Sequence, residues 1–210
     1  MSVRNPHAPG RLSNVAAALL VGGPSSRMGR DKAHIEIGGV AMATRLAELL
    51  SSMCEDVILV GGNPPEEAPG RRVSDPEIEG EQERSSLRGI VGALEAAQAE
   101  RVLVVATDTP LLTGDLLLAL IAFPSHDAVV VEDASGRLHP LCGVYTREAV
   151  LPLARQRLAA GDLMLRSLLG AVDTQVLGGA DLAAVDPQGM ALTNINTPEE
   201  LERARTSLAE

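Results

Sequence analysis

The sequence predicts an α/β fold in three layers, with a mostly parallel central sheet between helices. Short apolar runs typical of strands buried on both faces alternate along the chain with segments of helical spacing. Strands that alternate with helices form right-handed βαβ units, which place helices on both faces of the sheet. The chain has 210 residues, 45% of them apolar and only 1% aromatic, so we expect one domain whose core is built from Ala, Leu, Val and Ile.

The apolar runs define the expected strands. Residues 1–14 carry two prolines and no periodicity, so we expect a flexible leader followed by a single domain over 15–210. The first apolar run ends at a Gly-Gly-Pro sequence, which indicates a sharp exit from the strand. Strands are predicted at 15–21, 57–60, 102–106 and 128–131.

The helices are predicted between and after these strands. Segment 63–86 is acidic and rich in Pro and Gly, so we expect a surface loop with at most one short strand near Val73. The last helix is expected to start at Pro198, with Thr197 as its N-cap and acidic residues in its first turn. Helical spacing occurs at 41–53, 87–99, 114–122, 146–158 and 163–169.

Charge and composition exclude several classes of partner. The formal net charge is −10 and aromatic residues are nearly absent, which argues against binding to nucleic acid. No run of 18 apolar residues is available to span a membrane, and the polar first 14 residues lack a signal-peptide pattern, so we expect a cytoplasmic protein. Cys54 and Cys142 stand 88 positions apart without a CxxC motif, so we expect two buried thiols and neither a zinc site nor a disulfide.

A glycine-rich loop follows the first strand, with the sequence GGPSSRMGRDK at 22–32. Gly22 and Gly23 let backbone N–H groups turn toward an anion, Ser25 adds a hydroxyl donor, and Arg27 and Lys32 add positive charge. The pattern is neither a Walker loop nor GxGxxG. It predicts a phosphate-binding loop, and the alternative is an ordinary glycine turn with two solvated cations.

The stretch LLVGGPSSRMGRDK resembles the LAGGxSxRMGxDK signature of the molybdenum cofactor guanylyltransferase family. Further motifs stand in the order of that family: SSLRGI at 85–90, TDTP at 107–110, HPL at 139–141 before an expected strand, and TNINTPEEL at 193–201. The resemblance covers nearly the whole chain after residue 14. It implies a Rossmann-like nucleotidyltransferase fold and an enzyme that transfers GMP from GTP to the terminal phosphate of molybdopterin, with pyrophosphate as the second product.

Three charged residues are the candidates for the chemistry. Asp108 follows the strand at 102–106, which places its carboxylate at the carboxyl end of the sheet, where open α/β folds bind ligands. A hard carboxylate suits Mg²⁺, and the resemblance assigns Asp108 to that metal. The alternative is a turn or helix-capping role for Asp108. Lys32 is expected to contact the transferring phosphates, and Arg27 to assist on the β and γ groups.

The remaining nucleotide contacts are expected at the exits of the first strands. They are Leu20, Gly22, Gly23, Ser25 and Asp75, with Lys32 and Asp108. Asp75 matches a nucleotide-contacting Asp of the family, although Ser-Asp-Pro is also a common turn. The family's Asn after the second strand is absent, since Gly61 and Gly62 occupy that region and Asn63 comes only afterwards.

Other residues have two open interpretations each. His139 is a candidate contact to the pterin phosphate or a structural hydrogen-bonding residue. Asn194 and Asn196 either bind the acceptor or hold the C-terminal helix. Arg88 lies near a helix N-terminus, which favours anions.

Three alternative functions stay open beside guanylyl transfer. They are cytidylyl transfer to the same cofactor, nucleotidyl transfer to a sugar phosphate, and a non-catalytic escort that binds the cofactor. The family's habit at Gly22-Gly23 favours guanine, and we expect the missing side chain of Gly22 to let a purine approach the backbone. The expected partners are GTP, molybdopterin, and a molybdoenzyme or its chaperone, with no nucleic acid and no membrane.

Overall fold

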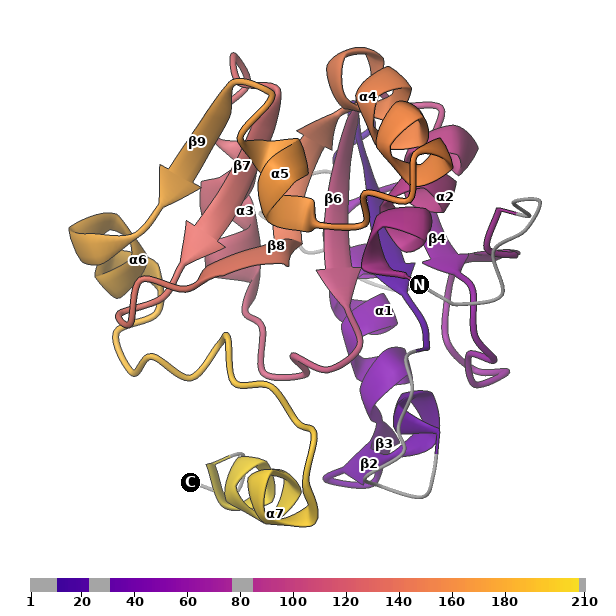
Figure 1. Cartoon of the computed structure of the whole chain (residues 1–210). Coiled ribbons are helices and arrows are strands. Elements are labelled where there is room, and N and C mark those ends of the chain that lie inside the picture. Colours follow the sequence, from indigo (N-terminus) through magenta and orange to yellow (C-terminus); the bar gives the residue numbers. More distant parts are fainter. Residues whose placement is uncertain (1–10, 23–30, 77–84, 208–210) are drawn as a thin grey trace, which may run out of the picture.

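A seven-stranded sheet lies between two layers of helices in the computed structural model, which describes residues 11–22, 31–76 and 85–207 (Figure 1). The strand order is β5-β4-β1-β6-β8-β7-β9. Four of the six pairings are parallel, and β8 runs antiparallel to β6 and β7. The predicted three-layer α/β fold with a mostly parallel sheet is confirmed.

The parallel half of the sheet carries the strands that end together. These are β1 (Val15–Leu20), β4 (Val57–Val60), β5 (Arg71–Val73) and β6 (Arg101–Ala106). Leu20 is in register with Val60 on one side and with Ala106 on the other, so three strand ends form one edge. The other half consists of β7 (Ala128–Glu132), β8 (Leu138–Thr146) and β9 (Thr174–Leu177).

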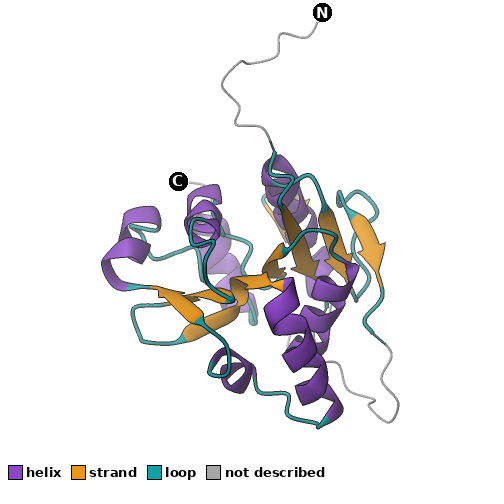
Figure 2. Ribbon diagram, turned by 90° about the horizontal axis from the view of Figure 1, so that it is seen from above, coloured by secondary structure: helices purple, strands orange, loops and turns teal. Residues whose placement is uncertain are grey.

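Each face of the sheet has its own apolar core, because alternate residues of a strand point to opposite faces. Leu19 of β1 belongs to the core shared with α1 (Met42–Met53) and α3 (Gly114–Ile121). Ala18 belongs to the core shared with the helices of the opposite layer, and Figure 2 shows the two layers from above. That layer contains α2 (Ser86–Ala96), α4 (Arg147–Ala159) and α5 (Leu165–Leu169).

A third, smaller core lies beyond the carboxyl edge of the sheet. There α7 (Pro198–Ser207) packs next to the hairpin of β2 (Glu36–Ile37) and β3 (Val40–Ala41), which follows the short 3₁₀ helix η1 (Lys32–His34). Ile37 and Ile195 are fully buried in this cluster. The C-terminal helix therefore lies beyond the carboxyl edge of the sheet, beside the β2–β3 hairpin (Figure 1).

Several predicted bounds are wrong. The HPL motif does not precede a strand but lies inside β8, whose first four residues are only partly buried and lack a clear strand pattern. The second predicted helix ends at Ala96 rather than 99, because extended Ala97 starts the turn into β6. The hairpin, β9 and α6 (Gly179–Val185) were not predicted, since β9 is a partly exposed edge strand and α6 has no buried residue.

The expected leader lies mostly outside the described residues, but its end packs against the domain. The N–H of Leu12 donates to the Met53 carbonyl at 2.7 Å, and Leu12 forms a parallel bridge with Cys54. The packed fold therefore begins before Val15. As expected, both cysteines are buried thiols without a disulfide. None of the helices in the described ranges is long and apolar enough to cross a membrane.

Candidate active site

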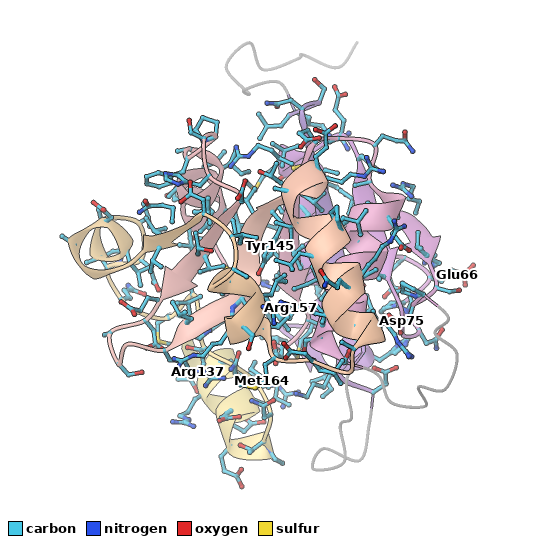
Figure 3. All side chains as sticks on the ribbon, turned by 45° about the horizontal axis from the view of Figure 1, so that its top comes forward. Glu66, Asp75, Arg137, Tyr145, Arg157 and Met164 are labelled. Atoms are coloured by element: carbon cyan, nitrogen blue, oxygen red, sulfur yellow. The ribbon has the colours of Figure 1, made fainter. Side chains whose placement is uncertain are left out.

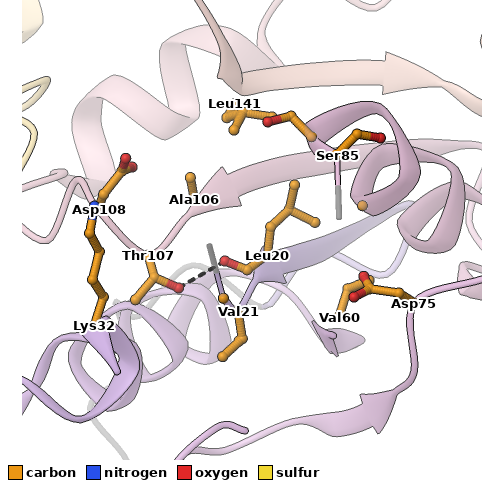
Figure 4. A pocket seen from close by; sticks show the side chains of 13 residues that line it. Leu20, Val21, Lys32, Val60, Asp75, Ser85, Ala106, Thr107, Asp108 and Leu141 are labelled. Atoms are coloured by element: carbon orange, nitrogen blue, oxygen red, sulfur yellow. Dashed lines mark hydrogen bonds between the residues drawn. The ribbon is translucent and has the colours of Figure 1, made fainter. Parts of the chain in front are cut away.

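A cavity of about 240 Å³ opens at the common end of β1, β4 and β6, which is the place predicted from the strand exits (Figure 4). Parallel strands that end in register leave their following loops side by side, so residues distant in sequence converge here. The cavity is lined by Leu20, Val21, Gly22, Lys32, Val60, Asp75, Ser85, Ser86, Gly89, Ala106, Thr107, Asp108 and Leu141.

Hydrogen bonds between the strand exits hold the floor of the cavity. The Thr107 hydroxyl donates to the Leu20 carbonyl at 2.8 Å, and the Val21 N–H donates to the Val60 carbonyl, also at 2.8 Å. Gly22 follows with a φ of 111°, a conformation that residues with a side chain rarely adopt. The chain therefore leaves β1 through a turn that requires glycine at this position.

A second glycine pair, Gly61-Gly62, leaves β4 next to this turn. A Cβ on Gly62 would lie 2.2 Å from the Val21 carbonyl oxygen, and a Cβ on Gly61 would lie 2.5 Å from a carboxylate oxygen of Asp75. Both residues have positive φ. Because Gly61 has no side chain, the Asp75 carboxylate can lie close to this turn. The pair was expected from the sequence only as a departure from a family pattern, although its position after a buried strand is similar to that of Gly22-Gly23.

Lys32 reaches the cavity from η1. The Asp31 carboxylate caps this short helix by accepting from the Ala33 N–H at 3.0 Å. The Lys32 ammonium donates to Asn196 Oδ1 at 2.5 Å, across 164 positions of sequence. The C-terminal motif therefore holds the amine of Lys32, which is the only lysine of the chain.

Asn196 is held in turn by the start of α7. Glu200 Oε2 accepts from the backbone N–H groups of Asn196 at 2.7 Å and Thr197 at 3.0 Å. The Thr197 hydroxyl accepts from the Glu200 N–H at 3.2 Å, which completes a capping box and confirms Thr197 as the N-cap. Of the two interpretations of Asn196, the structure shows contact with both the helix cap and Lys32.

Asp108 follows β6 and lines the cavity beside the Lys32 amine (Figure 4). Its carbonyl accepts from the Ile195 N–H at 2.8 Å, which ties the C-terminal motif to this loop as well. Asp108 lies in a turn, as the alternative expected, but it does not cap a helix, because Thr113 caps α3 by accepting from the Leu116 N–H. The Asp108 carboxylate is therefore not used by a helix end.

The donor set at Asp108 fits one kind of metal site. Over residues 11–22, 31–76 and 85–207 there is no group of three His, Cys, Asp or Glu side chains able to hold a metal ion. Mg²⁺ needs no such cage, since it commonly binds one or two carboxylates together with substrate phosphates and water. Asp108 therefore fits as the protein ligand of a Mg²⁺ ion that arrives with a nucleotide.

The cavity has two chemically different ends (Figure 4). Lys32 and Asp108 lie at one end, and Asp75 lies at the other, with Leu20 and Val60 between them. Ser85, the N-cap of α2, and Ser86 also line the wall, so the positive end of that helix dipole faces the cavity. The arrangement suits an elongated ligand with an anionic end, an apolar middle and a hydrogen-bonding end.

The structure brings together five residues predicted from the sequence, namely Leu20, Gly22, Lys32, Asp75 and Asp108. Three further predicted residues, Gly23, Ser25 and Arg27, lie outside the described residues. Arg88 is buried within α2 and does not line the cavity. Asn63 also stays outside the cavity, and its carbonyl is 2.9 Å from His34 Nε2.

Two adjoining cavities, together called the distal groove, continue from Asp108 away from Asp75. The nearer one, of about 190 Å³, is lined by Asp108, His139 and Asn194 among others. The farther one, of about 440 Å³, is also lined by Arg137, His139 and Asn194 and adds the cation of Arg203. Figure 3 shows Arg137 and Asp75 well apart, and the shared lining residues make the three cavities adjoin one another.

His139 in this groove is paired with Asp133. His139 Nε2 lies 2.9 Å from Asp133 Oδ2, while Asp133 Oδ1 accepts from the Ser135 hydroxyl at 2.6 Å and its N–H at 2.9 Å. The Ser135 hydroxyl, the hydrogen bond with His139 and backbone donors hold the pKa of Asp133 well below its usual range. Asp133 is therefore a carboxylate at neutral pH.

Comparison with known proteins gives consistent results. Residues 17–176 match the family model of the MobA-like NTP transferase domain. The chain is 30% identical over 196 residues to a molybdenum cofactor guanylyltransferase of Desulfosudis oleivorans, covering 92% of this chain and 96% of the relative. It is 32% identical over 199 residues to one of Cereibacter sphaeroides, covering 90% and 95%.

Solved structures share the fold at lower identity. Molybdopterin-guanine dinucleotide biosynthesis protein A from Archaeoglobus fulgidus matches with a TM-score of 0.76 and 21% identity, covering 92% of this chain and 98% of the other. A 2-C-methyl-D-erythritol 4-phosphate cytidylyltransferase from Thermus thermophilus matches with a TM-score of 0.68 and 16% identity, covering 94% and 100%.

Proposed function

Because the chain belongs to the MobA-like NTP transferase family, we propose that it transfers GMP from GTP to the terminal phosphate of molybdopterin. Membership makes the chain a nucleotidyltransferase enzyme of molybdenum cofactor biosynthesis, and the proposed specificity for GTP follows the guanylyltransferases among its relatives. The observation that carries the proposal is the cavity at the strand ends, with Lys32 and Asp108 at one end and Asp75 at the other. These ends match the triphosphate and the nucleoside of GTP.

The reaction is an in-line displacement at the α-phosphorus of GTP. A phosphate oxygen of molybdopterin forms the new P–O bond while the bond to the β-phosphate breaks, and pyrophosphate leaves with the electron pair. Lys32 neutralises the charge that gathers on the phosphates. Among the described residues, Asn196 is the one hydrogen-bond partner of the Lys32 ammonium. Two of the three N–H donors of Lys32 are therefore available for phosphate oxygens.

Asp108 is the proposed ligand of Mg²⁺. When bound there, the ion would neutralise phosphate charge and favour departure of pyrophosphate. The Asp108 carboxylate would then join the ion to the loop that the Ile195 N–H fixes. From the sequence motif, we propose that Arg27 binds the β and γ phosphates.

The nucleoside end is proposed to bind guanosine. The Asp75 carboxylate can accept hydrogen bonds from ribose hydroxyls or from the N–H groups of the base, and Leu20, Val60 and Val21 offer apolar contact. Gly22 has a positive φ, so Gly22→Ala would strain the backbone as well as crowd a purine. Base choice is therefore better tested with different nucleotides on the unaltered enzyme.

The distal groove is proposed to bind the acceptor. Asp108 lines both the nucleotide cavity and the nearer part of the groove, so a phosphate in the groove lies next to the triphosphate end. Arg137 and Arg203 offer cationic partners for the phosphate of an acceptor, beside the carboxylates of Asp133 and Glu200 in the same lining. We propose the cytoplasm as the compartment and a molybdoenzyme or its chaperone as the recipient of the product.

The test is a substrate panel with Mg²⁺ present. GTP, CTP and ATP are each combined with molybdopterin or with a sugar phosphate, while pyrophosphate release and product mass are recorded. We expect turnover with GTP and molybdopterin and a product of the mass of the guanine dinucleotide. A preference for CTP, or turnover only with a sugar phosphate, would contradict the proposal. Binding of molybdopterin without turnover would favour the escort function.

A further inference from the structure

We infer that Asp133 and His139 form an acceptor-recognition pair, in which Asp133 fixes the histidine tautomer so that Nδ1 accepts a hydrogen bond from an N–H group of the acceptor's heterocycle. The inference rests on the proposed function, since it takes a pterin as the ligand of the distal groove. Asp133 acts only through His139 and is a positioning residue, whereas His139 contacts the ligand.

His139 is unusually placed for a purely structural histidine. Its side chain is only 10% exposed, yet the residue lines both cavities of the distal groove. Asp133 binds Nε2, and within the part of the chain that the structure describes Nδ1 has no hydrogen-bond partner. A largely buried polar ring with one fixed and one open nitrogen, in a residue that lines a groove, is suited to recognise a ligand.

The tautomer follows from the hydrogen bonds of Asp133. Oδ1 accepts three donors, namely the Ser135 hydroxyl and N–H and the Arg137 N–H at 3.1 Å. Oδ2 is left for His139, and a carboxylate can only accept. Nε2 of His139 therefore carries a proton, and the tautomer that Asp133 selects has Nδ1 as its acceptor. A pterin carries N–H donors on its ring edge and amino group, so an acceptor nitrogen in the groove complements it.

The chain contains a second histidine–aspartate pair that serves as a control. His126 Nδ1 lies 3.0 Å from Asp173 Oδ2, but the side chains are 31% and 63% exposed. Neither residue lines the nucleotide cavity or the distal groove. An Asp→Asn substitution in this pair replaces the carboxylate beside a histidine ring with an amide, but at a place away from the distal groove.

The decisive variant is Asp133→Asn. The three donors around Oδ1 require the amide oxygen at that position, so the NH₂ group must face His139 and donate to Nε2. The ring proton then moves to Nδ1, and the groove presents a donor where it presented an acceptor. We expect the KM for molybdopterin to rise at least about tenfold, as one hydrogen bond is replaced by two opposed donors. The KM for GTP should change less than twofold.

Long-range ¹H–¹⁵N spectra of the histidine rings provide a readout besides activity. We expect the protonated nitrogen of His139 to change from Nε2 to Nδ1 in Asp133→Asn, and Asp173→Asn to leave the KM for molybdopterin unchanged. A changed tautomer with an unchanged KM for molybdopterin would overturn the inference while the proposed function stands. An unchanged tautomer would overturn it too.

A variant that leaves Asp133 in place covers the case in which Asp133→Asn fails to fold. His139→Ala keeps the three donors on Oδ1 and so preserves the hairpin turn, and it should also raise the KM for molybdopterin at least about tenfold. A normal KM in this folded variant would overturn the inference. An unaltered enzyme that releases no pyrophosphate from GTP and molybdopterin would overturn the proposed function and the inference together.

Discussion

Lys32→Ala removes the cation at the phosphate end of the cavity, and we expect it to lower kcat by about 30- to 1000-fold. Two unit charges about 4 Å apart interact by about 4 kcal/mol at an effective dielectric constant of about 20. Because Lys32 is only half-buried, we take half of that value as the lower bound. A barrier higher by about 2–4 kcal/mol gives this range, since each 1.36 kcal/mol changes the rate about tenfold.

The same substitution should cost little stability. Lys32 contributes one side-chain hydrogen bond, to Asn196, so we expect a loss of about 1 kcal/mol and a Tm lower by about 2–4 °C. The matched control is Arg155→Ala, which removes one positive charge, as Lys32→Ala does. Arg155 of α4 forms an ion pair with Glu95 of α2 at 2.7 Å and does not line the nucleotide cavity. The control should keep its kcat.

The assay is pyrophosphate release under saturating GTP and molybdopterin, with Tm measured in parallel. Because Lys32 is the only lysine, reductive methylation with ¹³C-formaldehyde adds a single side-chain NMR signal beside that of the terminal amine. GTP should shift this signal. A folded Lys32→Ala variant whose kcat lies within threefold of the unaltered enzyme would refute the role of Lys32.

A double-mutant cycle tests the contact between Lys32 and Asn196. Asn196→Ala should lower kcat by about tenfold, less than Lys32→Ala, because the amine stays but is no longer held. In the double variant the loss should equal that of Lys32→Ala alone. Fully additive losses would show that Asn196 acts independently of the amine.

Three further predictions concern the metal ligand, a glycine and the thiols. Asp108→Asn should lower kcat at least about 100-fold and raise the Mg²⁺ requirement, and an unchanged Mg²⁺ titration curve would contradict this role. Gly62→Ala should lower the free energy of unfolding by about 3 kcal/mol or more, since its Cβ would lie 2.2 Å from a carbonyl oxygen. Gly38→Ala, with positive φ but open space around it, should lose only about 1 kcal/mol in urea unfolding, and equal losses would contradict the steric argument. Burial disfavours the thiolate and raises the pKa of Cys54 to about 11 and that of Cys142 to about 12. At pH 8 about one thiol in 1000 or fewer is therefore ionised, and iodoacetamide should label the two cysteines only after unfolding. Rapid labelling of the native protein would contradict this prediction.

Strands with two buried faces could be predicted from the sequence because their pattern is a continuous apolar run. All residues of β1, β4 and β6 are buried, and the predicted bounds differ from the observed ones by at most one residue. The first four residues of β8 and the first three of β9 lie at more exposed places, where the sheet tolerates polar residues. Their pairing depends on β7, which lies between them, so local pattern carried little signal for either strand.

The sequence by itself determined the parallel α/β core and the edge at which the site lies, because apolar runs and the residues that follow them are local features. Lys32 and Asp108 were accessible to such reasoning, since each belongs to a sequence motif that follows a predicted strand. Only the tertiary structure decided which groups hold them. Asn196 binds Lys32 across 164 positions, and the Ile195 N–H binds the Asp108 carbonyl. Contacts between residues so far apart in the sequence depend on how the C-terminal motif packs beyond the sheet edge. The periodicity within one segment carries no information on how two segments are placed relative to each other.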